Sequence, residues 1–372
     1  MLMKYGMPKK NKLLLWYWGR RGGGSRYTLE LARALKSRDD IELYISLSSN
    51  NELLDKFRDL DVPLHVVRTY KSKFSFLISL TRLWLVRRGF FHYIKKNGIE
   101  SVLSPMPHLW SPFILSIFKK YKIFFISTIH DPKPHLGEYI SYPKAMIKRE
   151  INAANHVICL SESVATSLRN LYNYPRHQVS VCPHGIFSFG QDFTANKWPE
   201  ENQVFRFLFF GRIRRYKGLP LLLEAFSKLV KEGANVELTI AGNGNVEPFS
   251  QLMKTPGIKA QIRWIDESEI PVFYGNCHAV VLPYIAASQS GIWGDAAAFQ
   301  KPCVVTPMDG LVEQIEDGVT GVIAEEVTVK KYADSMQRIM EPGLYKKLVQ
   351  NLKKLDQSEE WDSAASKIAQ LL

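Results

Sequence analysis

Short apolar runs alternate with helix-patterned segments along both halves of this 372-residue chain. In the first half, the runs predict strands at residues 13–18, 41–46, 102–104, 123–129, 156–160 and 179–181. The second half repeats the pattern, with strands expected at 205–210, 236–240, 262–265, 279–282, 303–306 and 321–324. Strands that alternate with helices build parallel sheets covered by helices on both faces. We therefore expect an α/β protein with two Rossmann-like, doubly wound parallel-sheet domains.

The length of the chain is comfortable for two domains with separate cores. We expect an N-terminal domain over residues 1–187 and a C-terminal domain over residues 203–355, joined by the loose polar run 187–202. No stretch approaches the roughly 20 apolar residues that a spanning helix needs. The four cysteines form no close pair, which is typical of small core residues in a reducing cytoplasm.

The positive charge is concentrated in the first half of the chain. Residues 1–187 hold 29 Lys and Arg against 13 Asp and Glu, whereas residues 188–372 hold 20 against 23. Residues 62–99 contain eight basic residues, no acidic residue and many aromatic ones, the composition of a helix at a membrane interface. We expect this segment to contact an anionic membrane surface. An ordinary core helix with a solvated basic edge is the alternative.

Two basic residues follow a buried-strand run in the second half. Gly211 follows the apolar run 208–210, and Arg212 and Lys217 come between this glycine and a helix-patterned stretch at 219–231. The carboxyl end of a strand beside a helix N-terminus is where open α/β sheets bind phosphate. Arg212 and Lys217 are therefore candidates for stabilising a departing diphosphate. The alternative is a solvated basic turn, in which Arg214 and Arg215 take part.

Several motifs of the second half occur in a recognisable order. They are Phe210-Gly211-Arg212 with Lys217-Gly218, Ile240-Ala241-Gly242-Asn243-Gly244, Leu282-Pro283, Lys301-Pro302, and Asp309-Gly310 followed by Glu313 and Glu316-Asp317-Gly318-Val319-Thr320-Gly321. In these motifs the chain resembles glycosyltransferase family 4, whose members are retaining enzymes of the GT-B fold. The resemblance implies two domains that face a cleft, and a last helix, about 356–372, that packs back on the first domain.

The resemblance also implies roles for single residues. Arg212 and Lys217 would hold the leaving diphosphate, and His130 with Asp131 would lie near the reacting sugar. Amides of Gly22, Gly23 and Gly24, after the first strand, can approach a phosphate, although the alternative is a turn that needs positive φ. Gly242, Asn243 and Gly244 are expected to line the nucleobase pocket, with an ordinary strand-to-helix turn as the alternative. A loop with His135 and Glu138 is expected at the acceptor. A lone histidine after a strand can also be structural.

Asp295 departs from the family pattern. Family members carry two glutamates seven residues apart, and alignment on Lys301-Pro302 gives Asp295 the second place, at the ribose of the donor. The first carboxylate is missing near Ala287 or Ser288. The sugar contact is then expected from Ser288, Gln289 and the amides of Ser290 and Gly291. The alternative for Asp295 is a helix N-cap.

The resulting prediction is a hexosyl-transferring, retaining enzyme at the cytoplasmic face of the membrane. Its expected donor is a nucleoside-diphosphate sugar, UDP- or GDP-linked, and its expected acceptor is a glycan, lipid-linked, in surface polysaccharide assembly. We expect no cofactor and no metal, since no Asp/His cluster has metal-ligand spacing. Two alternatives stay open. One is a GT-B epimerase or hydrolase of sugar nucleotides, and the other is a nucleic-acid-binding protein, although no RNA-binding motif is present.

Overall fold

The computed structural model describes residues 10–70, 73–132, 144–189 and 203–372. They divide into two compact units. The first comprises the described residues up to 185 together with Ser358–Leu372, and the second comprises the described residues from 186 to 357. Most of the expected linker, residues 190–202, lies outside the described residues.

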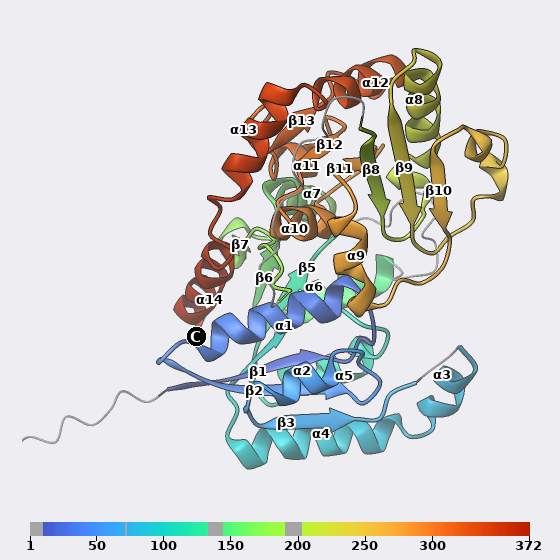
Figure 1. Cartoon of the computed structure of the whole chain (residues 1–372). Coiled ribbons are helices and arrows are strands. Elements are labelled where there is room, and N and C mark those ends of the chain that lie inside the picture. The colour runs from blue at the N-terminus through green and yellow to red at the C-terminus, as the bar shows by residue number, and fades with distance from the viewer. Residues whose placement is uncertain (1–9, 71–72, 133–143, 190–202) are drawn as a thin grey trace, which may run out of the picture. The chain divides into compact units, whose positions relative to one another are not determined.

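The first unit is a seven-stranded parallel sheet in the order β3-β2-β1-β4-β5-β6-β7 (Figure 1). Its strands are β1 (Asn11–Tyr17), β2 (Ile41–Ser48), β3 (Leu64–Val67), β4 (Ser101–Ser104), β5 (Phe124–Ile129), β6 (His156–Cys159) and β7 (Val179–Val181). Its helices are α1 (Gly23–Lys36), α2 (Leu54–Arg58), α3 (Lys73–Leu80), α4 (Leu83–Asn97), α5 (Ser111–Lys120), α6 (Lys144–Ala153), α7 (Glu162–Tyr172) and α14 (Glu359–Leu371).

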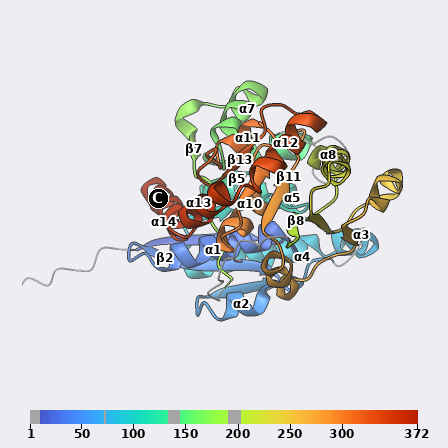
Figure 2. The same cartoon turned by 45° about the horizontal axis from the view of Figure 1, so that its top comes forward.

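The second unit is a six-stranded parallel sheet in the order β10-β9-β8-β11-β12-β13. Its strands are β8 (Phe205–Phe210), β9 (Val236–Ala241), β10 (Ile258–Gln261), β11 (Ala279–Leu282), β12 (Cys303–Val305) and β13 (Gly321–Ile323). Its helices are α8 (Leu219–Lys231), α9 (Ile270–Gly275), α10 (Gly291–Ala298), α11 (Asp309–Val312), α12 (Val329–Arg338) and α13 (Pro342–Leu352). Helices α8 and α12 lie side by side (Figure 2).

The apolar runs form strands because both faces of each sheet are covered. Leu13, Leu14, Leu15 and Trp16 are all fully buried, so neighbouring side chains on opposite faces of β1 are both excluded from water. A strand buried on two faces is continuously apolar rather than alternating. The prediction of two doubly wound parallel sheets is confirmed.

The C-terminal helix α14 belongs to the first unit, beside α1 (Figure 1, Figure 2). The ring centroid of Trp361 lies 5.3 Å from that of Tyr27, and Lys367 Nζ donates to the carbonyl of Val181 at 2.7 Å. A Cβ on Gly185 would lie 2.5 Å from the Trp361 ring, so glycine is needed there for this packing. These contacts link the last helix to the end of the first sheet.

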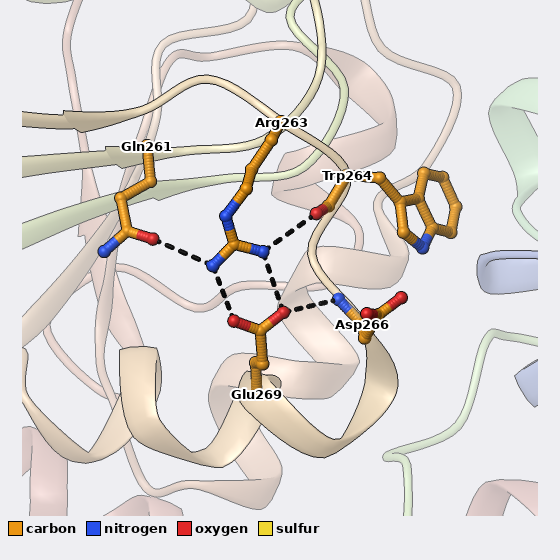
Figure 3. Close-up of polar contacts among 5 residues, drawn as sticks. All are labelled: Gln261, Arg263, Trp264, Asp266 and Glu269. Carbon is orange, nitrogen blue, oxygen red and sulfur yellow. Dashed lines mark hydrogen bonds and ion pairs between the residues drawn. The ribbon is translucent and has the colours of Figure 1, made fainter.

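The expected strand at 262–265 is wrong. The strand of this region is β10, and the chain then turns, as Figure 3 shows, around the side chain of Arg263. This guanidinium donates to Glu269 Oε2 at 2.8 Å and to the carbonyl of Trp264 at 3.0 Å, while Glu269 Oε2 accepts from the amide of Asp266 at 3.0 Å. The Arg263 bonds lower the pKa of Glu269 to about 2. Residues 262–265 thus form a turn instead of a strand, because the side chains of Arg263 and Glu269 bond each other and the backbone of Trp264 and Asp266.

The basic segment 62–99 is not one helical surface. It contains strand β3 and helices α3 and α4, and Phe90 is fully buried in the core with Trp16 and Phe118 at ring-centroid distances of 5.5 and 6.3 Å. Phe90 therefore cannot contribute to the membrane contact that was expected of this segment. Trp84, by contrast, is 61% exposed.

All four cysteines are buried and free, as expected of core residues. Within the described part of the chain, no helix is both long and apolar enough to cross a membrane.

Candidate functional site

The strand order places a switch point in each sheet. From β8 the chain first builds outward through β9 and β10, and then returns to add β11 on the other side of β8. Ligands of open α/β sheets bind outside the carboxyl ends of the strands that flank such a point. In the second unit these are the ends of β8 and β11, where Gly211 and Pro283 begin the following loops.

The loops after β8 and β9 are packed backbone to backbone. The amide of Gly211 donates to the carbonyl of Ala241 at 2.9 Å, and the amide of Ile213 donates to the carbonyl of Asn243 at 2.8 Å. Gly242 has a φ of 148°, and a Cβ there would lie 1.9 Å from the carbonyl oxygen of Gly211. The predicted nucleobase residues Gly242, Asn243 and Gly244 thus directly adjoin the turn that carries Arg212.

Lys217 is held inward at this edge. Lys217 ends the 3₁₀ turn Arg215–Lys217 and is only 7% exposed. Its Nζ lies 5.0 Å from the ring centroid of Tyr284, which follows β11. Gly218 comes next with a φ of 65°, and a Cβ there would lie 1.8 Å from the carbonyl oxygen of Pro283. The turn after β8 is therefore fixed against the turn after β11, with the lysine between them.

Arg212 lies on the same turn but is exposed, as are Arg214 and Arg215. Arg212 is therefore accessible to solvent at the edge of the second sheet. Arg212, Arg214 and Arg215 are thus all exposed, and only Lys217 among the four basic residues of this turn is buried.

The polar loop Ser288, Gln289, Ser290 and Gly291 precedes α10, and its position is fixed by α11. A Cβ on Gly310 would lie 2.2 Å from the carbonyl carbon of Ser288. Gln314 accepts from the amide of Ser290 at 2.8 Å, and Tyr284 and Ser290 share a hydroxyl hydrogen bond at 3.3 Å. The amides that open α10 thus lie on a rigid support, at a helix end that attracts anions.

Asp295 is fully buried in the middle of α10. The helix begins at Gly291 with Ser290 as its N-cap, so the alternative of Asp295 as an N-cap is wrong. Tyr274 Oη donates to Asp295 Oδ2 at 3.4 Å.

The glycine turn of the first unit opens α1. Gly22 is the N-cap with a φ of 80°, and Gly23 and Gly24 are the first helical residues. A Cβ on Gly24 would lie 2.6 Å from Tyr17 Oη, so this glycine permits close packing on β1. Glu52 Oε1 accepts from the amide of Gly22 at 2.5 Å. Like a phosphate, a carboxylate is an anionic hydrogen-bond acceptor. The Gly22 amide of the predicted phosphate site is thus already bonded to the Glu52 carboxylate.

His130 directly follows β5 and lies next to α1, the helix that the glycine turn opens. Its Nε2 donates to the carbonyl of Pro105 at 2.8 Å, and its ring centroid lies 5.0 Å from that of Tyr27 on α1. Burial lowers the pKa of His130 to about 4, against smaller opposite effects of the Pro105 carbonyl and Asp131. The imidazole is therefore neutral at pH 7, with Nδ1 as a hydrogen-bond acceptor. The expected acceptor residues His135 and Glu138 lie outside the described residues.

Arg212, Lys217, 242–244 and 288–291 lie together at one sheet edge of the second unit. In the first unit, residues 22–24 open α1, and His130 contacts Tyr27 of the same helix.

Sequence reasoning missed Glu52 and Gln314. Glu52 follows β2, the neighbour of the strand β1 that precedes Gly22. Gln314 follows β12 and α11, and β12 is the neighbour of the strand β11 that precedes Ser290. Only the strand order shows that these residues lie close together.

Comparison with known proteins gives two family matches that follow each other along the chain. The family described as Glycosyltransferase Family 4 matches residues 21–187, and Glycosyl transferases group 1 matches residues 190–355. Among curated proteins, an uncharacterized glycosyltransferase of Methanocaldococcus jannaschii is 26% identical over 56% of this chain and 57% of its own length. The capsular polysaccharide biosynthesis glycosyltransferase CapM of Staphylococcus aureus is 24% identical over 52% and 54%. The matches span little more than half of either relative.

Among solved structures, Anabaena HepE in complex with UDP and glucose superposes with a TM-score of 0.70 at 15% identity, covering 96% of this chain and 99% of its own. At this identity the likeness concerns the fold, and it extends over both units. The two family matches and this shared fold agree, and the chain belongs to the group 1, family 4 glycosyltransferases.

Proposed function

We propose that the protein transfers a hexosyl group from a nucleoside-diphosphate sugar, UDP- or GDP-linked, to a glycan acceptor. The observation that carries this proposal is the carboxyl edge of the second sheet, where Lys217 is packed inward between the ends of β8 and β11 beside the exposed Arg212. A nucleotide sugar leaves a diphosphate, and fixed cations with helix N-terminal amides stabilise that developing charge.

We propose that transfer retains the configuration of the sugar. In this mechanism the acceptor hydroxyl attacks from the face that the diphosphate leaves, and a leaving phosphate oxygen takes its proton. Arg212, Lys217 and the amide of Gly291 hold the charge, and His130 offers Nδ1 to a sugar or acceptor hydroxyl. The proposed chemistry uses no metal and no further cofactor, because two cations of the protein carry the neutralisation.

The proposed acceptor is a lipid-linked glycan in the assembly of a surface polysaccharide, such as O-antigen, capsule or exopolysaccharide. A relative named for capsular polysaccharide biosynthesis supports the pathway class. The scarcity of acidic residues in the basic part of the first unit supports a membrane-bound substrate at the cytoplasmic face.

A panel of UDP, GDP, CDP, ADP and dTDP tests the donor class by thermal shift. We expect one uridine or guanosine diphosphate to raise the melting temperature well above the others, because a specific site stabilises the fold in proportion to occupancy. Product analysis with the matching sugar nucleotide then separates the activities. Transfer to a glycan supports the proposal, whereas free sugar alone or an epimerised donor would favour a hydrolase or an epimerase. No shift with any of the five would refute the donor site.

Asp295→Asn tests the proposed ribose contact. Loss of a charged acceptor that bonds a hydroxyl costs about 1.5–3 kcal/mol, so we expect the KM for the donor to rise about tenfold or more. A 2′-deoxy donor should lose little further in this variant, while the wild type discriminates against it.

Tyr274→Phe is the matched control, because it removes the hydroxyl that bonds Asp295 and leaves the carboxylate in place. It should keep the discrimination against the 2′-deoxy donor. If wild type and Asp295→Asn discriminate equally, Asp295 has only a structural role.

A further inference from the structure

Helices α4 and α5 are joined into one surface. The guanidinium of Arg87 on α4 donates to the carbonyl of Phe113 at 3.1 Å and to Ser116 Oγ at 2.8 Å, both on α5. Farther along, Phe91 stacks on Tyr121 with ring centroids 3.8 Å apart. The two helices therefore hold their outer side chains in a fixed relation.

The outer stripe of α4 alternates aromatic and basic residues. Trp84, Arg88, Phe91 and Lys95 follow one another at helical spacings of four, three and four, so they share one face. Trp84 is 61% exposed, Arg88 and Lys95 are exposed, and Lys95 Nζ lies 5.5 Å from the ring centroid of Phe91. The residues that α4 turns to the core are others: Leu83, Phe90 and Ile94.

Helix α5 continues the pattern. Phe113 and Lys120 are seven residues apart on one face, and Phe113 is 43% exposed although the neighbouring Ile114 is fully buried. Lys120 Nζ lies 5.3 Å from the ring centroid of Tyr121. We call Trp84, Arg88, Phe91, Lys95, Phe113 and Lys120 the α4–α5 seam.

The charge around the seam is almost entirely positive. Residues 62–130 contain eleven Lys and Arg and a single acidic residue, Glu100. Within the described residues, no salt bridge is formed by Arg88, Lys95 or Lys120. Cations without acidic partners, beside large exposed aromatic rings, form an unusual surface for a protein that contacts only water.

We infer that the α4–α5 seam is the surface with which the protein lies on an anionic lipid bilayer. Tryptophan and phenylalanine favour the headgroup region, and nearby Lys and Arg are attracted by anionic headgroups. A second copy of the chain is a poorer partner, because a symmetric contact would bring cations against cations. Membrane contact at the seam would bring the protein to its proposed lipid-linked acceptor. This role rests on the proposed function, whereas the membrane contact itself does not.

Sedimentation of the full chain with vesicles tests the inference. We expect binding to vesicles of phosphatidylglycerol and phosphatidylcholine, release as salt rises, and little binding to pure phosphatidylcholine. The triple variant Arg88→Glu, Lys95→Glu, Lys120→Glu should lower the bound-to-free ratio at least about tenfold.

The matched control reverses three exposed lysines of the second unit, Lys330→Glu, Lys346→Glu and Lys347→Glu, and so changes the net charge equally. It should bind within about twofold of the wild type, because attraction falls off within a Debye length of the surface. Equal losses in both triple variants would show an effect of net charge alone and overturn the inference.

Trp84→Ala provides a test independent of charge. We expect weaker binding to anionic vesicles with unchanged melting temperature, because Trp84 is exposed. Wild-type protein that binds an RNA oligomer but ignores the vesicles would assign the seam to nucleic acid instead. Vesicle binding needs no donor, so this inference and the proposed transfer reaction can fail separately.

Discussion

Lys217→Ala and Arg212→Ala should each lower the turnover of sugar transfer by about 10²-fold or more. Removing one donor that stabilises a developing negative charge has an effect of this size. Lys217 has the stronger structural case, because its ammonium is buried between the ends of β8 and β11, where little water can replace it. The measurement is kcat with the nucleotide sugar that the thermal-shift panel identifies.

Arg214→Ala and Arg215→Ala are the matched controls, because they remove the same charge from the same turn. Both should keep turnover within about threefold of the wild type, a difference below 1 kcal/mol in activation free energy. Circular dichroism and melting curves verify the fold of all four variants. Near-normal turnover in both Arg212→Ala and Lys217→Ala would refute the leaving-group assignment.

Gly218→Ala should destabilise the second unit by about 3 kcal/mol or more. The left-handed conformation costs an alanine about 1–2 kcal/mol. The added Cβ would also lie 1.8 Å from the carbonyl oxygen of Pro283, a contact that only a backbone shift can relieve. The shift would part the turn of Lys217 from the loop after β11, so donor affinity should fall together with stability.

Gly233→Ala separates strain from contact. Gly233 also has positive φ, 84°, but a Cβ there would meet nothing within 4 Å. Gly233→Ala should therefore lower the free energy of unfolding by only about 1–2 kcal/mol. Urea titration of both variants gives the comparison, and equal losses would show that the approach of Gly218 to Pro283 does not support the site.

Much of the fold could be predicted because its strands are buried on both faces. Residues 13–16 have no exposed side chain, and an uninterrupted apolar run between turns has few other ways to fold. The glycines at 218 and 242 could be predicted as special positions, because Gly242 comes directly after a strand and Gly218 directly before a helix. The reason that glycine is required there is the close approach of Gly218 to Pro283 and of Gly242 to Gly211, and this depends on which strands are neighbours.

Other features depend on side chains that meet across long separations in sequence. Glu52 reaches the amide of Gly22, thirty residues earlier, and Gln314 bonds Ser290, twenty-four residues earlier. Local patterns carry no signal for either contact. The expected strand at 262–265 was wrong for a related reason, since Arg263 bonds both its neighbour's carbonyl and Glu269.

The basic segment shows where composition alone misleads. Trp84 and Phe90 are both aromatic residues of a basic helix, yet one is exposed and the other is fully buried. Helical spacing separates them, since Phe90 shares its face with Leu83 and Ile94. Composition indicated a membrane contact for the whole segment, whereas our inference confines it to one stripe of α4 and its continuation on α5.

Calorimetric titration with a nucleoside diphosphate and its parent nucleoside tests the central claim most directly, namely that the second unit recognises the diphosphate through Lys217 and Arg212. We expect the wild type to bind the diphosphate at least about tenfold more tightly than the nucleoside, and this preference to be nearly lost in Lys217→Ala and Arg212→Ala but kept in Arg215→Ala. A preference that is the same in the wild type and in both of the first two variants would contradict the account.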